Sequence, residues 1–222
     1  AYTNTTPVDA YRGAGRPEAA YMIERVMDRV ALELGLDPAE TRKRNFVQPD
    51  QMPYAQPTGT TLDTGEYALT LDLALKNAGY EGLRKEQEEA RKKGRYLGIG
   101  FSNYTETCGM GNGFILQFVG FDRGGYESAI VRVHPDGRAT VLSGSHSHGQ
   151  GHVTTFAQIA ADELGIAPEQ IEVLQGDTDM IPFGIGTFNS RSVPVGGSAV
   201  KVAAGRVAAK MRRIAAHLLQ CE

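Results

Sequence analysis

Residues 142–165 read LSGSHSHGQGHVTTFAQIAADELG, and this stretch decides how the second half of the chain folds. Before it, apolar residues alternate with polar ones over 129–133, which predicts a half-buried strand. Within it, apolar residues recur at helical spacing as far as Gly165, a good helix stop. Residues 149–151 therefore form a glycine-rich turn where a sheet leads into a helix.

Such a turn suits an anionic ligand. Gly149 and Gly151 let a ligand approach bare backbone, and the free N–H groups of a first helical turn attract phosphate. The side-chain amide of Gln150 both donates and accepts hydrogen bonds. A plain glycine-rich connection is the alternative, because short glycine motifs are weak support by themselves.

The flanking residues extend this sheet and its helices. Residues 134–137, HPDG, predict a tight turn into a partner strand at 139–142. Another strand is predicted at 171–174. Pro194 then precedes a predicted helix over 195–219, whose small apolar residues permit close packing on a neighbour.

A second anion-ready turn stands near the start of the chain. Two glycines at 13 and 15, flanked by Arg12 and Arg16, lie ahead of a helix predicted from Pro17 to a stop at Gly35. The alternative is that both arginines are solvated or paired with neighbouring carboxylates. The predicted helix carries an apolar stripe: Ala19, Met22, Ile23, Val26, Met27, Val30 and Leu34.

A third donor-rich segment is the long loop that ends at Ser192. Residues 184–192 bring hydroxyl and amide donors together with one arginine, Arg191, just before a helix. A loop of this length inside a compact domain usually carries function. Three such loops in one chain predict a large, phosphate-bearing cofactor that is held mainly by backbone groups.

The first half of the chain is predicted to be mostly helical. Short helices are expected at 38–44, 69–75 and 83–90, an irregular segment at 47–64, and a strand at 96–101. Residues 102–125 have no clear period and fit either an active-site loop or a second hairpin. The fold class is α+β, with mixed sheets and packed helices in two parts, 1–95 and 96–222.

Composition excludes several classes of protein. The 222 residues carry 23 basic and 26 acidic side chains, a net charge of −3, without the basic stripe of a nucleic-acid binder. No apolar run approaches the roughly 20 residues of a membrane span. The two distant cysteines indicate a reduced, cytoplasmic protein without its own iron–sulfur cluster. Since the chain opens without Met, we expect it to be a fragment of a longer polypeptide.

A metal site is the competing interpretation of the central turn. His146, His148 and His152 are imidazole ligands of the kind that zinc prefers. The glycines between them give no rigid scaffold, and no carboxylate or cysteine lies nearby in sequence. The prediction is therefore no metal held by these side chains, with one histidine bonded to a ligand and the others structural.

Three segments together resemble one known family. They are AYRGAGRPEA at 10–19, HGQGH at 148–152, and GDTD at 176–179 continuing to GTFNSRS at 186–192. In this order and spacing they resemble the molybdopterin-binding large subunit of the xanthine dehydrogenase, aldehyde oxidase and carbon monoxide dehydrogenase family. The resemblance covers nearly the whole chain and implies part of the molybdenum hydroxylase large-subunit fold.

This resemblance implies a cofactor, its site and its partners. The cofactor is a molybdopterin dinucleotide of the cytosine type with molybdenum, and iron–sulfur and FAD partner subunits carry the electrons away. The implied contacts are Arg12 and Gly13 beside the molybdenum and pterin, Gly149, Gln150 and Gly151 at the pterin or its phosphate, and Asn189, Ser190, Arg191 and Ser192 at the dinucleotide tail. The family's catalytic glutamate lies beyond this chain, so the fragment alone is expected to be inactive.

Two departures from the family pattern narrow the substrate. Members that oxidise carbon monoxide carry a copper-binding cysteine directly after the first arginine, where this chain has Gly13. Xanthine-oxidising members carry a phenylalanine at the position of Ala14. The resemblance then implies an enzyme that oxidises an aldehyde or a heterocycle with water as the oxygen source. The alternatives are a cofactor-free binding or assembly domain that kept the fold and, from the histidines, a zinc hydrolase.

Overall fold

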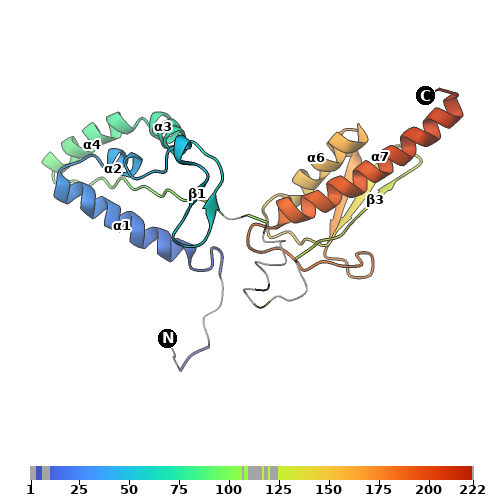
Figure 1. Ribbon diagram of the computed structural model, residues 1–222, viewed down its shortest axis with the longest axis horizontal. Helices are drawn as coiled ribbons and strands as arrows, with labels where there is room; N and C mark the ends of the chain where they lie inside the picture. Colours follow the sequence, from blue (N-terminus) through green and yellow to red (C-terminus); the bar gives the residue numbers. More distant parts are fainter. Residues whose placement is uncertain are drawn as a thin grey trace. The chain divides into compact units, whose positions relative to one another are not determined.

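The computed structural model consists of two compact units, Ala1–Thr105 and Glu106–Glu222, and the predicted boundary near residue 95 falls inside the first (Figure 1). The structure describes residues 4–6, 11–106, 108–109, 117, 120 and 125–221. Much of the predicted extended segment 1–11 and of the loop 102–125 lies outside these residues. None of the helices that the structure describes has the length and apolar character needed to cross a membrane.

The first unit contains helices at the predicted places, and the two predicted at 69–75 and 83–90 extend two or three residues further at each end. The helices are α1(Arg16–Leu34), α2(Pro38–Lys43), α3(Tyr67–Ala78) and α4(Tyr80–Lys92). Gly35 ends α1 and Gly79 separates α3 from α4, both in the left-handed conformation that glycine adopts without strain. Asp37 caps α2 because its Oδ1 accepts the N–H groups of Ala39 at 2.8 Å and Glu40 at 3.2 Å.

A buried ion pair joins α1 to α2. Nε of Arg42 lies 2.6 Å from Oε2 of Glu24, and Nη2 of Arg42 lies 2.9 Å from Oδ1 of Asp28. The side chain of Arg42 is only 2% exposed, and its guanidinium lies 4.7 Å from the ring centroid of Phe101. The face of α1 that packs against α2 is therefore the one that carries Glu24.

The apolar stripe predicted along α1 does not face the interior of this unit. Met22 is 63% exposed, Val26 55% and Leu34 64%. The buried positions of α1 are Glu24 and Ala31. Periodicity located an apolar face on this helix correctly, but the Glu24–Arg42 pair decides which face α2 covers.

Two connecting segments differ in how well the sequence predicted them. Residues 47–64 are mostly irregular, as expected, with η1(Pro49–Gln51) and one short hairpin formed by β1(Tyr54–Ala55) and β2(Thr61–Leu62). The strand predicted at 96–101 is wrong. Among the residues that the structure describes, this segment has no partner strand. Side chains pair with its backbone and with the residues after it: Nε2 of Gln87 donates to Leu97 O at 2.7 Å, and Asn103 N donates to Glu24 Oε1 at 2.5 Å.

The second unit contains a mixed three-stranded sheet. Its strands are β3(Ala129–Val133), β4(Ala139–Ser143) and β5(Ile171–Gln175), in the order β3-β4-β5. Strands β3 and β4 pair antiparallel with Val131 opposite Val141, whereas β4 and β5 pair parallel with Val141 opposite Val173. This confirms the predicted α+β class and the three predicted strands.

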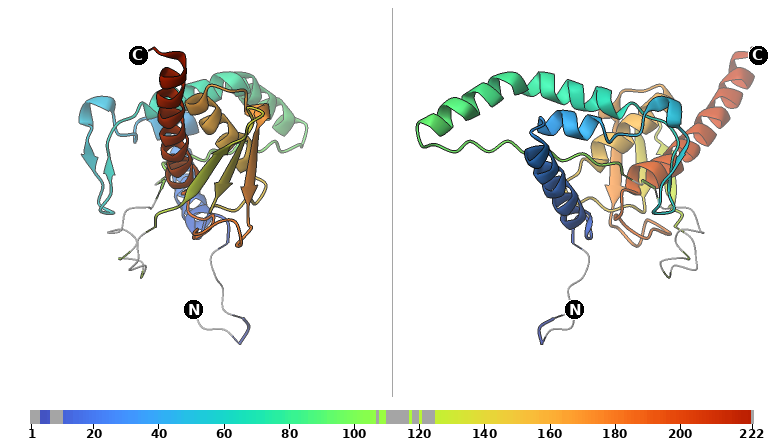
Figure 2. Two further views of the ribbon diagram at one scale, coloured as in Figure 1. Left: turned by 90° about the vertical axis from the view of Figure 1, so that its right-hand side faces the viewer. Right: turned by 60° about the vertical axis from the view of Figure 1, so that its left-hand side comes forward.

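Two long helices cover one face of this sheet (Figure 2). They are α6(His152–Leu164), reached from β4, and α7(Ser198–Leu219), which follows a π-helical segment η3(Ser192–Gly197). The short turn η2(Pro168–Gln170) leads into β5. The core between helices and sheet includes Val141, Val173, Phe156 and Val200, each at most 9% exposed.

The parallel pairing of β4 and β5 brings two loops to one edge of the sheet. Ser143 and Gln175, the last residues of these strands, lie opposite each other in register. The loops that follow, 144–151 and 176–191, therefore both start at the carboxyl edge. In open sheets of this kind, ligands bind outside the carboxyl ends of the strands.

Candidate functional site

The turn before α6 presents open backbone. Gly149 has φ 98° and Gly151 has φ 82°, and a Cβ added to either residue would meet nothing within 4 Å. No side chain in the described part of the chain caps α6, and its first turn contains no acidic residue. Gln150 is exposed, with Oε1 accepting the backbone N–H of His148 at 2.5 Å. The uncapped N–H groups of α6 are thus available to an anion.

The long loop after β5 holds the second group of predicted contacts. Asn189 and Ser190 both adopt the left-handed conformation, with φ of 51° and 53°. Oγ of Ser190 donates to Oε1 of Glu106 at 2.7 Å. Earlier in the loop, Oδ1 of Asp177 accepts the N–H groups of Asp179 at 2.9 Å and Met180 at 3.0 Å. These local bonds give the loop a defined backbone path.

Thr187 joins this loop to the glycine turn. Its Oγ1 accepts the backbone N–H of His146 at 3.1 Å and lies 3.0 Å from Oγ of Ser192. Its carbonyl oxygen lies 3.3 Å from Nε2 of His148. Two of the three predicted loops are therefore side by side in the second unit. Thr187 was missed as a site residue, although it stands inside the segment that carries the resemblance.

The same two loops also meet backbone to backbone. A Cβ added to Gly144 would come within 2.6 Å of Gly184 Cα and would overlap the carbonyl oxygen of Phe183. That carbonyl already accepts a hydrogen bond from Oγ of Ser128. Only glycine allows this approach at position 144, so the sequence of the turn and the position of the loop depend on each other.

The third predicted loop lies in the first unit. Arg12 and Gly13 are exposed in a turn closed by a 2.6 Å hydrogen bond from Ala14 N to Tyr11 O. Gly13 has φ 99°, and a Cβ there would lie 2.6 Å from the ring of Pro17. The proximity of Arg12 and Gly13 to the other two loops stays a prediction, because they belong to the other unit.

Arg191 occupies a different environment from its neighbours Asn189 and Ser190. Its side chain is 1% exposed and pairs with Glu127, whose side chain is 0% exposed, at 2.6 Å. By contrast, Ser190 is exposed and Asn189 partly exposed. Sequence reasoning grouped all of these residues as donors and missed Glu127, a single acidic residue before β3 that no local pattern marks.

The histidines near the turn do not form a metal cluster. The rings of His146 and His148 meet edge to face at 5.7 Å, while His152 is buried, stacks on Phe156 at 5.2 Å, and has Nδ1 3.4 Å from Nε2 of Gln175. Within the described part of the chain, no three His, Cys, Asp or Glu side chains are placed to hold a metal ion. The geometry gives the zinc alternative no support.

His152 predicts a pH dependence of stability. Burial, followed by the nearby positive charges of His148 and His146, lowers the pKa of His152 below its ordinary 6.5. The imidazole of His152 therefore binds a proton more readily in the unfolded chain than in the folded chain. The contribution of neutral His152 to the stability of the folded chain is complete above pH 6.5, and it is lost as the pH falls from 6.5 through the pKa of His152 in the folded chain.

We expect the free energy of unfolding, measured by urea denaturation, to be lower at pH 5.5 than at pH 7.5. His152→Phe keeps an aromatic ring beside Phe156 and removes the titrating group, so it is expected to weaken this pH dependence. An unchanged dependence in His152→Phe would show that other groups are responsible.

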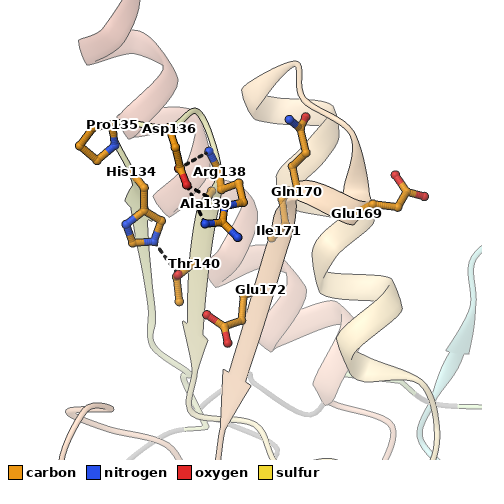
Figure 3. A pocket seen from close by; sticks show the side chains of 10 residues that line it. All are labelled: His134, Pro135, Asp136, Arg138, Ala139, Thr140, Glu169, Gln170, Ile171 and Glu172. Atoms are coloured by element: carbon orange, nitrogen blue, oxygen red, sulfur yellow. Dashed lines mark hydrogen bonds and ion pairs between the residues drawn. The ribbon is translucent and has the colours of Figure 1, made fainter.

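A separate hollow lies at the opposite edge of the sheet (Figure 3). It has a volume of about 650 Å³, and its lining includes the turn after β3 and the start of β5. Asp136 pairs with Arg138 at 2.7 Å, and Nε2 of His134 lies 2.8 Å from Oγ1 of Thr140. These polar groups satisfy one another and do not converge on a common point. The loops at the carboxyl edge are therefore the better candidate site.

Comparison with known proteins decides the family. The family model described as "Molybdopterin cofactor-binding domain" matches residues 73–222, and a second model with the same description matches residues 1–46. The chain belongs to the molybdopterin cofactor-binding domain family. Both turns of the second-unit site lie inside the larger match.

Relatives of this chain carry the names of oxidoreductases. It is 43% identical over 218 residues to the carbon monoxide dehydrogenase large chain of Afipia carboxidovorans, covering 95% of this chain and 27% of that one. It is 36% identical to the nicotine 6-hydroxylase large subunit of Paenarthrobacter nicotinovorans, covering 99% and 27%. The quinoline 2-oxidoreductase structure from Pseudomonas putida 86 matches with TM-score 0.85 and 37% identity, covering 97% and 27%. The chain thus spans about a quarter of the length of these relatives.

Proposed function

We propose that this chain is part of the large subunit of a molybdenum hydroxylase, and that its loops bind a molybdopterin dinucleotide of the cytosine type. The observation that carries the proposal is the contact of two predicted cofactor loops through Thr187 in the second unit. Membership of the molybdopterin cofactor-binding domain family supports the identity of the ligand.

The residues present fit such a cofactor. Gly149 and Gly151 leave open space above the backbone, the start of α6 is uncapped, and Gln150 is exposed. Neutral donors and backbone N–H groups suit a pyrophosphate without overcharging its site. In the proposal, these groups hold the pterin and its phosphate, while Asn189 and Ser190 border the dinucleotide tail. Ser192, which is buried and whose Oγ donates to Thr187, supports this part of the loop from beneath. The bound cofactor would supply the oxidation of a substrate carbon with oxygen from water.

The proposal includes the rest of the enzyme. Since the relatives are large chains or large subunits about four times as long, we propose that the remaining polypeptide supplies the family's glutamate base. These residues alone would then be inactive. Iron–sulfur and FAD subunits would accept the electrons. A cytoplasmic location is consistent with Cys108 and Cys221, which are both exposed free thiols.

The substrate is proposed to be an aldehyde or a heterocycle. A copper-binding cysteine cannot replace Gly13 without strain, because φ is 99° and a Cβ would lie 2.6 Å from Pro17. Ala14 also offers no aromatic ring to stack on a purine. Two relatives carry names with heterocyclic compounds, nicotine and quinoline, which supports this substrate class.

Gln150→Ala tests the cofactor site in the complete polypeptide. Losing one charge-assisted hydrogen bond is expected to weaken cofactor retention about tenfold, so molybdenum and pterin content should fall together. Gln158→Ala, an exposed glutamine on α6, is the matched control and should retain the cofactor. Equal content in both variants would favour the alternative, a cofactor-free binding or assembly domain.

A further inference from the structure

The ion pair between Glu127 and Arg191 lies beneath the loop proposed to border the dinucleotide tail. The side chains are 0% and 1% exposed, with Nη1 of Arg191 2.6 Å from Oε2 of Glu127. Glu127 lies two residues before the start of β3, and Arg191 directly precedes η3. The pair therefore connects the start of the sheet to the end of the loop, across 64 positions of sequence.

The guanidinium of Arg191 donates its hydrogen bonds to groups of the protein itself. Besides Glu127, Nη1 donates to Gly186 O at 2.5 Å, and Nη2 donates to Gly125 O at 2.8 Å and Tyr126 O at 3.2 Å. Among the described residues, Nε of Arg191 has no partner, and this atom is buried too. A guanidinium held in this way does not reach a ligand on the surface of the loop.

The same bonds determine the path of the loop. The bond to Gly186 O fixes the residue before Thr187, and the guanidinium lies 5.4 Å from the ring centroid of Phe188. Arg191 itself follows Ser190, which has the left-handed φ of 53°. Both ends of the segment that carries Thr187, Asn189 and Ser190 are thus tied to one buried side chain.

Burial of the Glu127–Arg191 ion pair has a free-energy cost. Oε1 of Glu127 has no hydrogen-bond partner within the described part of the chain. Burying two charged groups loses their hydration, and a buried ion pair is often no more stabilising than an apolar pair of similar volume. Positioning a loop is one use for which this cost is accepted.

We propose that Arg191 and Glu127 are positioning residues that hold residues 186–190 in place for the cofactor tail, and that Arg191 does not contact the tail. This inference rests on the proposed function. It assigns Arg191 a positioning role in place of the direct contact with the tail that the resemblance implied. It assigns to Glu127 a role that its sequence position does not suggest.

Glu127→Gln in the complete polypeptide separates the two roles of Arg191. If Arg191 positions the loop, losing the charge of Glu127 should raise backbone hydrogen exchange in residues 186–191 about tenfold and lower the molybdenum and pterin content. Exchange in β4 and α6 should stay unchanged. If Arg191 contacts the anionic tail, Glu127→Gln frees its guanidinium, and unchanged or higher cofactor content would overturn the proposal.

Matched variants complete the test. Asp136→Asn removes a carboxylate from an exposed pair in the same unit and should change neither exchange in 186–191 nor cofactor content. Arg191→Lys keeps the positive charge but loses the forked set of donors. If Glu127→Gln does not fold, this variant serves in its place, and it should also raise hydrogen exchange in residues 186–191 alone. Exchange that rises equally in β4, α6 and the loop would mean a merely structural pair and would also overturn the proposal.

Failure of the proposed function has a different signature. A wild-type polypeptide that contains neither molybdenum nor pterin contradicts the proposed function, whatever the variants do. A wild type that contains both, with Glu127→Gln retaining them fully, contradicts only the positioning role.

Discussion

Gly144→Ala is expected to destabilise the second unit by about 2–3 kcal/mol, at the upper end of the usual cost of overpacking. The added methyl group would overlap the carbonyl oxygen of Phe183 and lie 2.5 Å from Oε1 of Glu127 and 2.6 Å from Cα of Gly184. Two of these three obstacles are backbone atoms, which cannot rotate away. The loop must therefore move from the end of β4, and the glycine turn and the long loop separate.

The measurement is the midpoint of urea denaturation, together with cofactor content of the complete polypeptide. Gly205→Ala is the matched control: its Cβ would meet only the flexible carboxylate of Glu163, at 3.3 Å, inside α7. Alanine favours a helix over glycine by about 1 kcal/mol, so this variant should be neutral or more stable. Equal effects of the two substitutions would contradict the close contact at Gly144.

Arg42→Ala is expected to destabilise the first unit by about 3–5 kcal/mol, because it leaves the buried carboxylate of Glu24 without its partner. Arg42 also donates to Asp28 and to the backbone oxygens of Pro38 and Glu24, at 2.9–3.1 Å. Without these bonds, α2 loses its attachment to α1, the helix that follows the turn containing Arg12. Thermal denaturation followed by circular dichroism gives the size of the loss.

Arg29→Ala is the matched control for this substitution. Arg29 lies on the same helix, α1, and pairs with Glu33, but both side chains are more than 65% exposed. Exposed pairs of this kind contribute about 0.2–1 kcal/mol. If Arg29→Ala and Arg42→Ala were equally mild, the Glu24–Arg42 pair would not hold α1 to α2.

Local patterns in the sequence predicted most of the elements. The alternation over 129–133 and the helical spacing after Gly151 reflect which side chains face the core, so β3 and α6 follow directly. The segment 96–101 shows the limit of this reasoning. It has strand-like residues, but a strand needs a partner, and its polar backbone groups instead meet side chains such as Gln87.

The candidate site was predictable to a similar degree. Glycines around Gln150 at a sheet-to-helix turn indicated open backbone, and the structure has it there. Sequence could not separate the buried Arg191 from the exposed Ser190, because neighbouring loop residues can point in opposite directions. Glu127 was missed because its partner lies 64 positions away and only the folded chain brings the two together.

The molybdenum and pterin content of the complete wild-type polypeptide tests the central claim most directly. The protein would be produced in a host that assembles the molybdopterin cytosine dinucleotide, and metal and pterin would be measured by elemental analysis and by fluorescence of the oxidised pterin. The account predicts both in equimolar amounts with the polypeptide. Protein that is folded, obtained from such a host, and free of both would contradict it.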